Sequence, residues 1–205
     1  IHLGWYGTDL SGPTALAELV SAVAEVPGLQ RLRLSSLQPA EVDEALLEAM
    51  DHPVVCPHLH LPLQSGDAEV LRRMRRPYTP DEFLEAVEMA RGRLDRPAAT
   101  TDVMVGFPGE TEGAFARTME VCREARFSRM HVFAFSARPG TRAARMEGAV
   151  PPQVASDRSE RLRAVGKDLA VEWAESFVGW RVRVLFERCR GDRLTGYTDR
   201  YVRLT

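Results

Sequence analysis

The chain has 205 residues, of which 44% are hydrophobic and 27% are charged, and its 27 basic and 29 acidic residues leave a net charge of −2. This is the composition of a globular protein of one domain or slightly more, and it excludes a disordered chain, a collagen-like repeat and a small disulfide scaffold. The apolar runs are far shorter than the ~20 residues that cross a bilayer, so we expect no membrane partner, and the small net charge alone predicts no nucleic-acid partner.

The first residues, 1–7, resemble the end of a strand and the loop after it, without an initiator methionine, and suggest an internal piece of a longer protein. Apolar spacing then predicts alternating helices and strands. In chain order these are a helix over 13–26, a strand over 29–34, a helix over 39–50, a strand over 58–63, a short helix capped by Ser65 or Asp67, a helix over 79–94, a strand over 99–105, a helix over 111–126 and a strand over 130–135. This α/β order requires parallel strands with helical crossovers, and it favours part of a (β/α) barrel.

The pattern changes after Gly148. A linker over 150–152 leads into one long, charged helix that ends near residue 177, and alternating residues on both sides of a turn at 191–192 predict a β-hairpin that ends near Leu204. We therefore expect three parts, which are a partial barrel over 1–148, a linker and helix over 149–177, and the truncated start of a small β domain over 178–205.

Polar or glycine-rich loops follow each predicted barrel strand. They lie at residues 4–7, 35–36, 64–66, 106–110 and 136–141. In parallel barrels the chemistry takes place at the carboxyl ends of the strands, so we expect these loops to line one rim. Each loop alone is equally well explained as an ordinary turn, but the five together favour a site.

The loop over 106–110 carries the strongest local signal. Gly106 allows a ligand to approach the backbone, and Thr111 begins a helix whose free N–H groups face the same rim. Glu110 can accept a hydrogen bond from a hydroxyl or an amine, or it merely offsets the dipole of that helix. The loop lacks the lysine and the glycine spacing of a phosphate-binding loop.

Two clusters leave alternatives open. His58 and His60 lie on one face of their strand, either as a metal pair or, as we favour because no third ligand is near, as histidines of the core or rim. Residues 72–76 include four arginines, which form either a solvated helix face or a contact for RNA phosphates.

Five stretches of the chain read LRLSS at 32–36, HLHLPLQSG at 58–66, VLRRM at 70–74, TDVMVGFPGET at 101–111 and SARPGT at 136–141. Together they resemble the radical-SAM methylthiotransferases, in the order of that family and over nearly the whole chain. The stretch GYTDRYVR at 196–203 is similar to the start of the family's C-terminal TRAM domain, a small β-barrel that holds RNA. The resemblance thus implies a partial radical-SAM barrel followed by the start of a TRAM-like domain.

The resemblance also implies a reaction, in which S-adenosylmethionine and two 4Fe–4S clusters place a methylthio group on an adenine carbon of tRNA, with a reductant protein as electron donor. Residues 34–36 and 130–133 look most like the branch that acts on N6-threonylcarbamoyladenosine beside the anticodon. The alternatives are a branch that acts on isopentenyl-adenosine in tRNA, a branch that acts on a ribosomal protein, and a non-catalytic RNA-binding remnant.

Carried over position by position, the resemblance implies two sets of site residues. The cofactor set is Gln64, Ser65, Asp102, Gly106, Phe107, Glu110, Val132 and Phe133, with residues 64–65 near the ribose of S-adenosylmethionine and the others mostly near its adenine. The substrate set is Tyr6, Arg33, Ser36, Arg72, Arg76 and Arg138, of which residues 6, 33 and 138 are candidates for the methionine carboxylate or the substrate base.

The chain departs from the family in its cysteines. Cys56, Cys122 and Cys189 match neither the C-x3-C-x2-C triplet nor any other ligand position of the family. We therefore expect the cluster ligands to lie outside this chain, no catalytic or metal-ligating residue within it, and no activity from this stretch alone. The scattered cysteines are typical of small buried side chains in a reducing compartment, which we take to be the cytoplasm.

Overall fold

Two three-stranded sheets form the β structure of the computed structural model, which describes residues 3–7 and 16–205. In the first, β1 (His58–His60), β2 (Ala98–Val105) and β3 (Arg129–Ala134) pair in parallel in that order. In the second, β4 (Val184–Arg190), β5 (Arg193–Thr198) and β6 (Arg203–Leu204) pair antiparallel. The prediction of parallel strands joined by helical crossovers is confirmed.

The helices are α1 (Leu16–Ala24), α2 (Glu44–Met50), α3 (Ala68–Met74), α4 (Pro80–Arg93), α5 (Glu112–Glu124) and α6 (Pro152–Glu175), with short 3₁₀ turns η1 (Leu3–Trp5), η2 (Pro39–Glu41) and η3 (Ala143–Arg145). Side chains cap α3, α4 and α5: Asp67 accepts from the third N–H of α3 at 2.9 Å, and Thr79 and Thr111 do the same for α4 and α5 at 3.2 and 3.1 Å. Asp67, and not Ser65, is therefore the cap of α3. No helix in these described ranges is long and apolar enough to cross a membrane.

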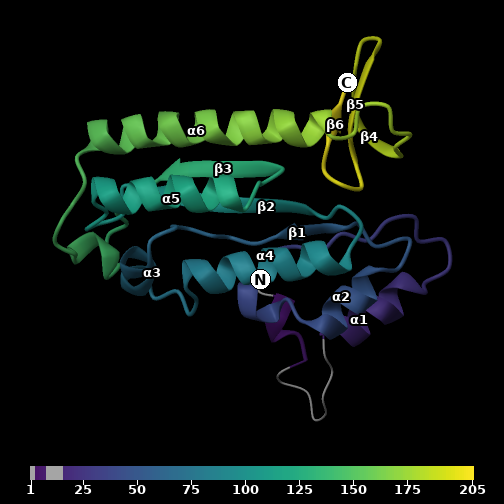
Figure 1. Cartoon of the computed structure of the whole chain (residues 1–205), viewed down its shortest axis with the longest axis horizontal. Coiled ribbons are helices and arrows are strands. Elements are labelled where there is room, and N and C mark those ends of the chain that lie inside the picture. Colours follow the sequence, from purple (N-terminus) through teal and green to yellow (C-terminus); the bar gives the residue numbers. More distant parts are fainter. Residues whose placement is uncertain (1–2, 8–15) are drawn as a thin grey trace.

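Helices α4 and α5 contribute to one buried core with the parallel sheet. That core includes Leu59, Phe83, Val103, Phe115 and Phe127. Helix α6 runs along β3 (Figure 1), where Arg163 donates a hydrogen bond to the Val132 carbonyl at 3.3 Å. Gly166 of α6 faces Met130, whose Cβ would lie 3.3 Å from an added methyl group. Helix α6 therefore packs directly against β3.

The first fifty residues differ from the sequence prediction. Residues 3–5 form the turn η1 instead of the end of a strand. The predicted strand over 29–34 is not a regular strand. Leu32 forms an isolated parallel bridge with Val55, and Ser36, just after this segment, forms another with His60. No run of consecutive residues in this described segment pairs with another segment. Residues 13–15 of the predicted first helix lie outside the described residues.

Two predicted elements are shorter than expected. The helix expected over 39–50 is divided into η2 and α2, because Asp43 accepts a hydrogen bond from the Leu46 N–H at 2.8 Å and starts a new helix. The strand expected over 58–63 is regular only to His60. Leu61 still donates to the Thr100 carbonyl at 2.9 Å, but Pro62 has no N–H with which to continue the ladder.

Residues 178–205, for which we keep the predicted name small β domain, contact the amino ends of the parallel strands. The Arg33 guanidinium donates to the Thr198 carbonyl at 3.0 Å, and the Tyr201 ring stacks on His58 with 4.9 Å between ring centroids. Figure 1 shows β4–β6 at the end of the molecule where α6 finishes. The hairpin is confirmed, whereas its membership of a TRAM-like barrel stays a prediction.

The His58 contact makes the stability of the fold depend on pH. Burial lowers the pKa of His58 to about 3, because the ring lies between Thr100 and Tyr201 and its Nδ1 has no partner in the described chain. As the pH falls, His58 therefore takes up a proton near pH 6.5 in the unfolded chain but only near pH 3 in the folded chain. We expect the free energy of unfolding to fall as the pH drops from 6.5 toward 3, by up to ~1.4 kcal/mol per pH unit.

Urea unfolding at pH 7, 6, 5 and 4 measures this loss, with His58→Phe as the comparison because phenylalanine keeps the stacking on Tyr201 and cannot titrate. The variant should lose less stability than the unsubstituted chain over this range. Equal losses in both proteins would assign the acid sensitivity to other groups.

Candidate functional site

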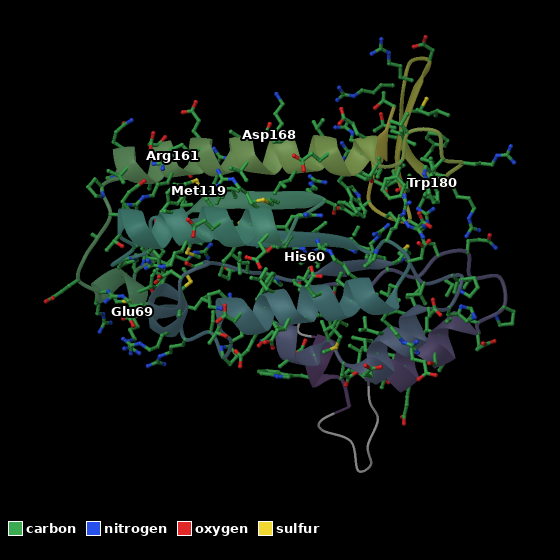
Figure 2. The ribbon with its side chains drawn as sticks, viewed as in Figure 1. His60, Glu69, Met119, Arg161, Asp168 and Trp180 are labelled. Atoms are coloured by element: carbon green, nitrogen blue, oxygen red, sulfur yellow. The ribbon has the colours of Figure 1, made fainter. Side chains whose placement is uncertain are left out.

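The carboxyl ends of the parallel strands bring three predicted site residues together. The Gln64 N–H donates to the Asp102 carbonyl, and the Met104 N–H donates to the Gln64 carbonyl, each at 2.9 Å. Phe133 of β3 is in register with Met104, and Gly106 follows the last residue of β2. Gln64, Gly106 and Phe133 therefore lie at one end of the sheet. Glu69 of the neighbouring α3 marks this end in Figure 2, and Trp180 marks the other.

A cavity of about 260 Å³ lies at this carboxyl edge, and we call it the rim cavity. Its walls are Gln64, Arg73, Met74, Arg75, Arg76, Met104, Phe107, Arg142, Ala143 and Met146. These residues come from the segment after β1, from α3 and the turn after it, from the end of β2 and the loop that follows, and from η3 with the residues on either side of it. Three methionines and one phenylalanine make the walls apolar, whereas four arginines make them cationic.

Gln64 has an unusual conformation at the wall of the rim cavity. Its φ is +63°, a left-handed value that costs a residue other than glycine about 1 kcal/mol. The residue is 5% exposed, and its side-chain amide forms no hydrogen bond with any residue in the described part of the chain. A strained backbone and an unpartnered amide at a cavity wall are features of ligand sites, because a ligand can satisfy the amide.

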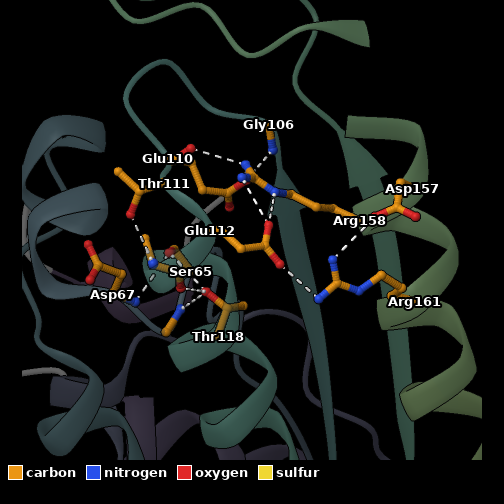
Figure 3. Close-up of polar contacts among 12 residues, drawn as sticks. Ser65, Asp67, Gly106, Glu110, Thr111, Glu112, Thr118, Asp157, Arg158 and Arg161 are labelled. Atoms are coloured by element: carbon orange, nitrogen blue, oxygen red, sulfur yellow. Dashed lines mark hydrogen bonds and ion pairs between the residues drawn. The ribbon is translucent and has the colours of Figure 1, made fainter. Parts of the chain in front are cut away.

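The loop over 106–110 is held by a buried ion pair with α6 (Figure 3). Glu110 Oε2 accepts from the Gly106 N–H at 2.7 Å and from Arg158 Nη1 at 2.8 Å, and the two side chains are 0% and 5% exposed. Burial raises the pKa of the Glu110 carboxyl, against the opposing effects of the Gly106 N–H and Arg158. A Cβ on Gly106 would lie 2.7 Å from that of Ala155, so the neighbour of this glycine is α6. The contacts of Glu110 are therefore structural.

Ser65 and Val132 also contact the protein itself. The buried Ser65 hydroxyl lies 3.4 Å from Thr118 Oγ1 of α5 and accepts from the Asp67 N–H at 3.2 Å. Val132 is buried, and its carbonyl accepts from Arg163. Of the predicted cofactor residues, Gln64 and Phe107 line the rim cavity, and the roles of Ser65, Gly106, Glu110 and Val132 as ligands stay predictions.

Asp102 and Phe133 lie on a polar face of the parallel sheet. The Asp102 carboxylate is 3.5 Å from His60 Nε2 on β1 and 3.3 Å from His131 Nδ1 on β3. The Phe133 ring is 5.4 Å from that of His131. Thr100 Oγ1 lies within 3.0 Å of a ring nitrogen of both His58 and His60, which supports the core-and-rim interpretation of these histidines. Residues 3–7 and 16–205 contain no group of three or more side chains that could hold a metal ion.

The predicted arginine patch is divided by its contacts. Arg72 is paired with Glu69 through hydrogen bonds of 2.6 and 2.8 Å. Arg73 donates to the carbonyls of Pro108 at 3.0 Å and Glu147 at 2.9 Å, and so ties α3 to the loops around the rim. Arg76 lines the rim cavity, as does Arg75 beside it.

The other predicted substrate residues are not brought to the rim cavity. Arg33 lies under the small β domain, with its guanidinium 4.9 Å from the centroid of the Tyr201 ring. Ser36 pairs with His60 through a single bridge, and Tyr6 and Arg138 are exposed. Of the substrate set, only Arg76 lines the cavity.

The cysteines do not fit an iron–sulfur cluster, which needs thiolate ligands that lie close together. Cys56 and Cys122 are buried, and burial raises the pKa of both thiols, that of Cys122 to about 12. Cys189 is exposed on the distant strand β4. We therefore assign no reaction step to a cluster on this chain.

Three important residues escaped the sequence prediction. Arg158 is 48 positions from its partner Glu110, and Arg142 lines the rim cavity from a separate loop, so no local pattern connects either residue with the site. Met104 could have been predicted from the sequence, because it lies two residues after Asp102 on β2 and therefore on the same face of the sheet.

Comparison with known proteins gives the family. The model of the radical SAM superfamily matches residues 4–122. The chain is 40% identical over 205 residues to a threonylcarbamoyladenosine tRNA methylthiotransferase of Thermotoga maritima, an alignment that covers 99% of this chain and 47% of that protein. It is 46% identical over 196 residues to a tRNA-2-methylthio-N6-dimethylallyladenosine synthase of Parafrankia sp., covering 93% of this chain and 39% of that protein. The chain thus spans less than half the length of these relatives.

A solved structure agrees in fold. Coproporphyrinogen III oxidase from Escherichia coli, a radical SAM enzyme, superposes with a TM-score of 0.58 at 16% sequence identity, over 84% of this chain and 44% of that one. This confirms the predicted partial radical-SAM fold. The chain belongs to the radical SAM superfamily and, as its motifs predict, is similar over nearly its whole length to the tRNA methylthiotransferases of that superfamily.

Proposed function

We propose that this chain is the part of a tRNA methylthiotransferase that holds S-adenosylmethionine and the target adenosine. The observation that carries the proposal is the similarity to such enzymes over 99% of the chain, together with a rim cavity at the carboxyl edge of the sheet. The proposed target is N6-threonylcarbamoyladenosine beside the anticodon. The two relatives described above differ in the modified adenosine that they are named for, so the choice between them rests on the residues of the site.

The structure supports two neighbouring binding regions. Asp102 and Phe133 on the polar face of the sheet are the candidates for S-adenosylmethionine, since a carboxylate can accept from ribose hydroxyls and a phenylalanine ring can stack on adenine. When bound there, S-adenosylmethionine would supply the means to remove a hydrogen atom from the substrate. The clusters and the reductant protein that this chemistry requires are proposed to come from outside these residues.

The arginines around the rim support an RNA partner. Arg75, Arg76, Arg138 and Arg142 form no side-chain hydrogen bond or ion pair in the described ranges, so they remain available for anionic groups of an RNA. A non-catalytic RNA-binding module would use the same arginines, and a test of catalysis has to separate the two functions.

The experiment uses the complete gene product that contains this chain, reconstituted anaerobically with iron and sulfide. We expect dithionite and S-adenosylmethionine to yield 5′-deoxyadenosine, and we expect tRNA to gain a methylthio group, both measured by liquid chromatography and mass spectrometry. Binding of S-adenosylmethionine without release of 5′-deoxyadenosine would contradict the proposal. If tRNA then bound with an affinity that falls steeply with salt, the non-catalytic module would be the better explanation.

A further inference from the structure

Three of the four arginines that line the rim cavity have no partner in the part of the chain that the structure describes. Within residues 3–7 and 16–205, Arg75, Arg76 and Arg142 form no side-chain hydrogen bond or ion pair, whereas the fourth, Arg73, donates to two carbonyls. Unpaired like charges around one cavity repel each other and attract an anion. The guanidinium group is suited to a carboxylate, because its N–H groups match the two oxygens.

The remaining walls restrict what this anion can be attached to. Met74, Met104, Phe107 and Met146 provide apolar surface, and methionine adapts its shape to different ligands. The cavity volume of about 260 Å³ is below the ~300–1,000 Å³ of typical small-molecule sites. The rim cavity therefore suits a substituent of a larger ligand better than a whole nucleoside or a whole cofactor.

Gln64 adds an independent sign of a ligand. Gln64 is 5% exposed and lines the cavity, and its side-chain amide forms no hydrogen bond in the described chain, although an amide offers both donors and an acceptor. A ligand that presents a carbonyl oxygen and an N–H would satisfy it, as a urea group does. An aliphatic group would leave the amide unsatisfied and the arginines unpaired.

We infer that the rim cavity binds the N6 substituent of the target adenosine, with Arg76 and Arg142 on its carboxylate and the Gln64 amide on its urea group. The inference rests on the proposed function and deepens it, because it names the residues that select a threonylcarbamoyl group over a dimethylallyl group. The dimethylallyl group has neither a carboxylate nor a urea. S-adenosylmethionine also carries a carboxylate, so the test has to distinguish these two sources.

The test measures binding of three anticodon stem-loop RNAs that differ only at N6 of the target adenosine: threonylcarbamoyl, dimethylallyl or no substituent. Fluorescence anisotropy should show that the complete gene product binds the threonylcarbamoyl RNA about ten-fold more tightly than the other two, as expected for one charge-assisted pair. Arg76→Met and Arg142→Met should each remove most of this preference, and Arg76→Lys should restore part of it.

Arg93→Met is the matched control. Arg93 is an exposed arginine near the end of α4, two residues before Asp95, which pairs with Arg200 of the small β domain at 2.8 Å. It should leave both the affinity and the preference unchanged. Circular dichroism and urea unfolding of each variant show whether the fold is retained.

The possible results separate the inference from the proposed function. If none of the RNAs binds, the proposed function fails. If all three bind equally, or if Arg76→Met weakens all three by the same factor, the arginines contact phosphates and the inference is overturned while the function stands. Equilibrium dialysis of S-adenosylmethionine with the reconstituted gene product is the second arm. If Arg76→Met no longer binds S-adenosylmethionine but still prefers the threonylcarbamoyl RNA, the cavity belongs to the cofactor. This result would also overturn the inference.

Discussion

Replacement of Arg158 by methionine is expected to lower the free energy of unfolding by about 3–5 kcal/mol at pH 7.5, as is usual when one partner of a buried ion pair is removed. The substitution leaves the Glu110 carboxylate fully buried without its counter-charge, and one of its oxygens, Oε1, already has no partner in the described chain. Urea unfolding followed by circular dichroism measures the loss.

The pH dependence identifies the cause of that loss. Without Arg158 the pKa of Glu110, already raised by burial, should rise further, so the folded variant takes up a proton above the pH at which the unfolded chain does. The deficit of the variant should therefore shrink as the pH falls from 7.5 to 5.5. The double variant Glu110→Gln with Arg158→Met should recover part of the stability at pH 7.5.

Arg161→Met is the matched control for this prediction. Arg161 is 41% exposed and pairs with Glu112 at 2.8 Å and Asp157 at 3.2 Å on the surface. Its replacement should cost less than ~1 kcal/mol. Equal losses for Arg158→Met and Arg161→Met would show that the buried pair does not contribute as we describe.

Gly106→Ala is expected to destabilise the chain by about 2–4 kcal/mol, from a left-handed backbone that alanine tolerates poorly and from overpacking. The φ of Gly106 is +75°, and the added methyl group would lie 2.7 Å from the Cβ of Ala155. Thermal or urea unfolding measures the change.

Two further variants separate the causes. Ala155→Gly removes the clash and leaves the backbone strain, so the double variant should be less destabilised than the sum of the two single variants. Gly92→Ala, in the last turn of α4 with no atom within 4 Å of the added Cβ, should be neutral or should stabilise the helix. A Gly106→Ala protein as stable as the unsubstituted chain would mean that α6 moves freely away from the loop.

The sequence predicts the local features of the fold well. Thr79 and Thr111 act as caps because a helix start depends on the few residues around it. Strands β2 and β3 and helix α5 are recognisable because their apolar residues repeat with a regular period. The strand expected near Leu32 fails for the opposite reason, since a strand exists only where a neighbour pairs with more than one of its residues.

The site is predictable only where a motif marks it. Gln64 and Phe107 belong to stretches with recognisable sequences, and both line the rim cavity. Arg142 and Arg158 reach the rim from other parts of the chain, so their positions follow only from the tertiary fold. The role of Gly106 also depends on the tertiary fold. The sequence shows that a glycine is needed here, but it does not show whether the space beside the glycine is filled by a ligand or by Ala155 of α6.

The length of α6 determines how far apart two surfaces of the molecule lie. Ala155 lies beside the rim, and Trp173 donates a hydrogen bond to the Arg200 carbonyl of the small β domain at 3.1 Å. These two residues of α6 are 18 positions apart, which corresponds to about 27 Å along the helix. A mononucleotide can reach only one of these surfaces. A polynucleotide that contacts both surfaces must span that distance. The length of helix α6 therefore favours a folded RNA arm over a free nucleotide as the ligand that contacts both.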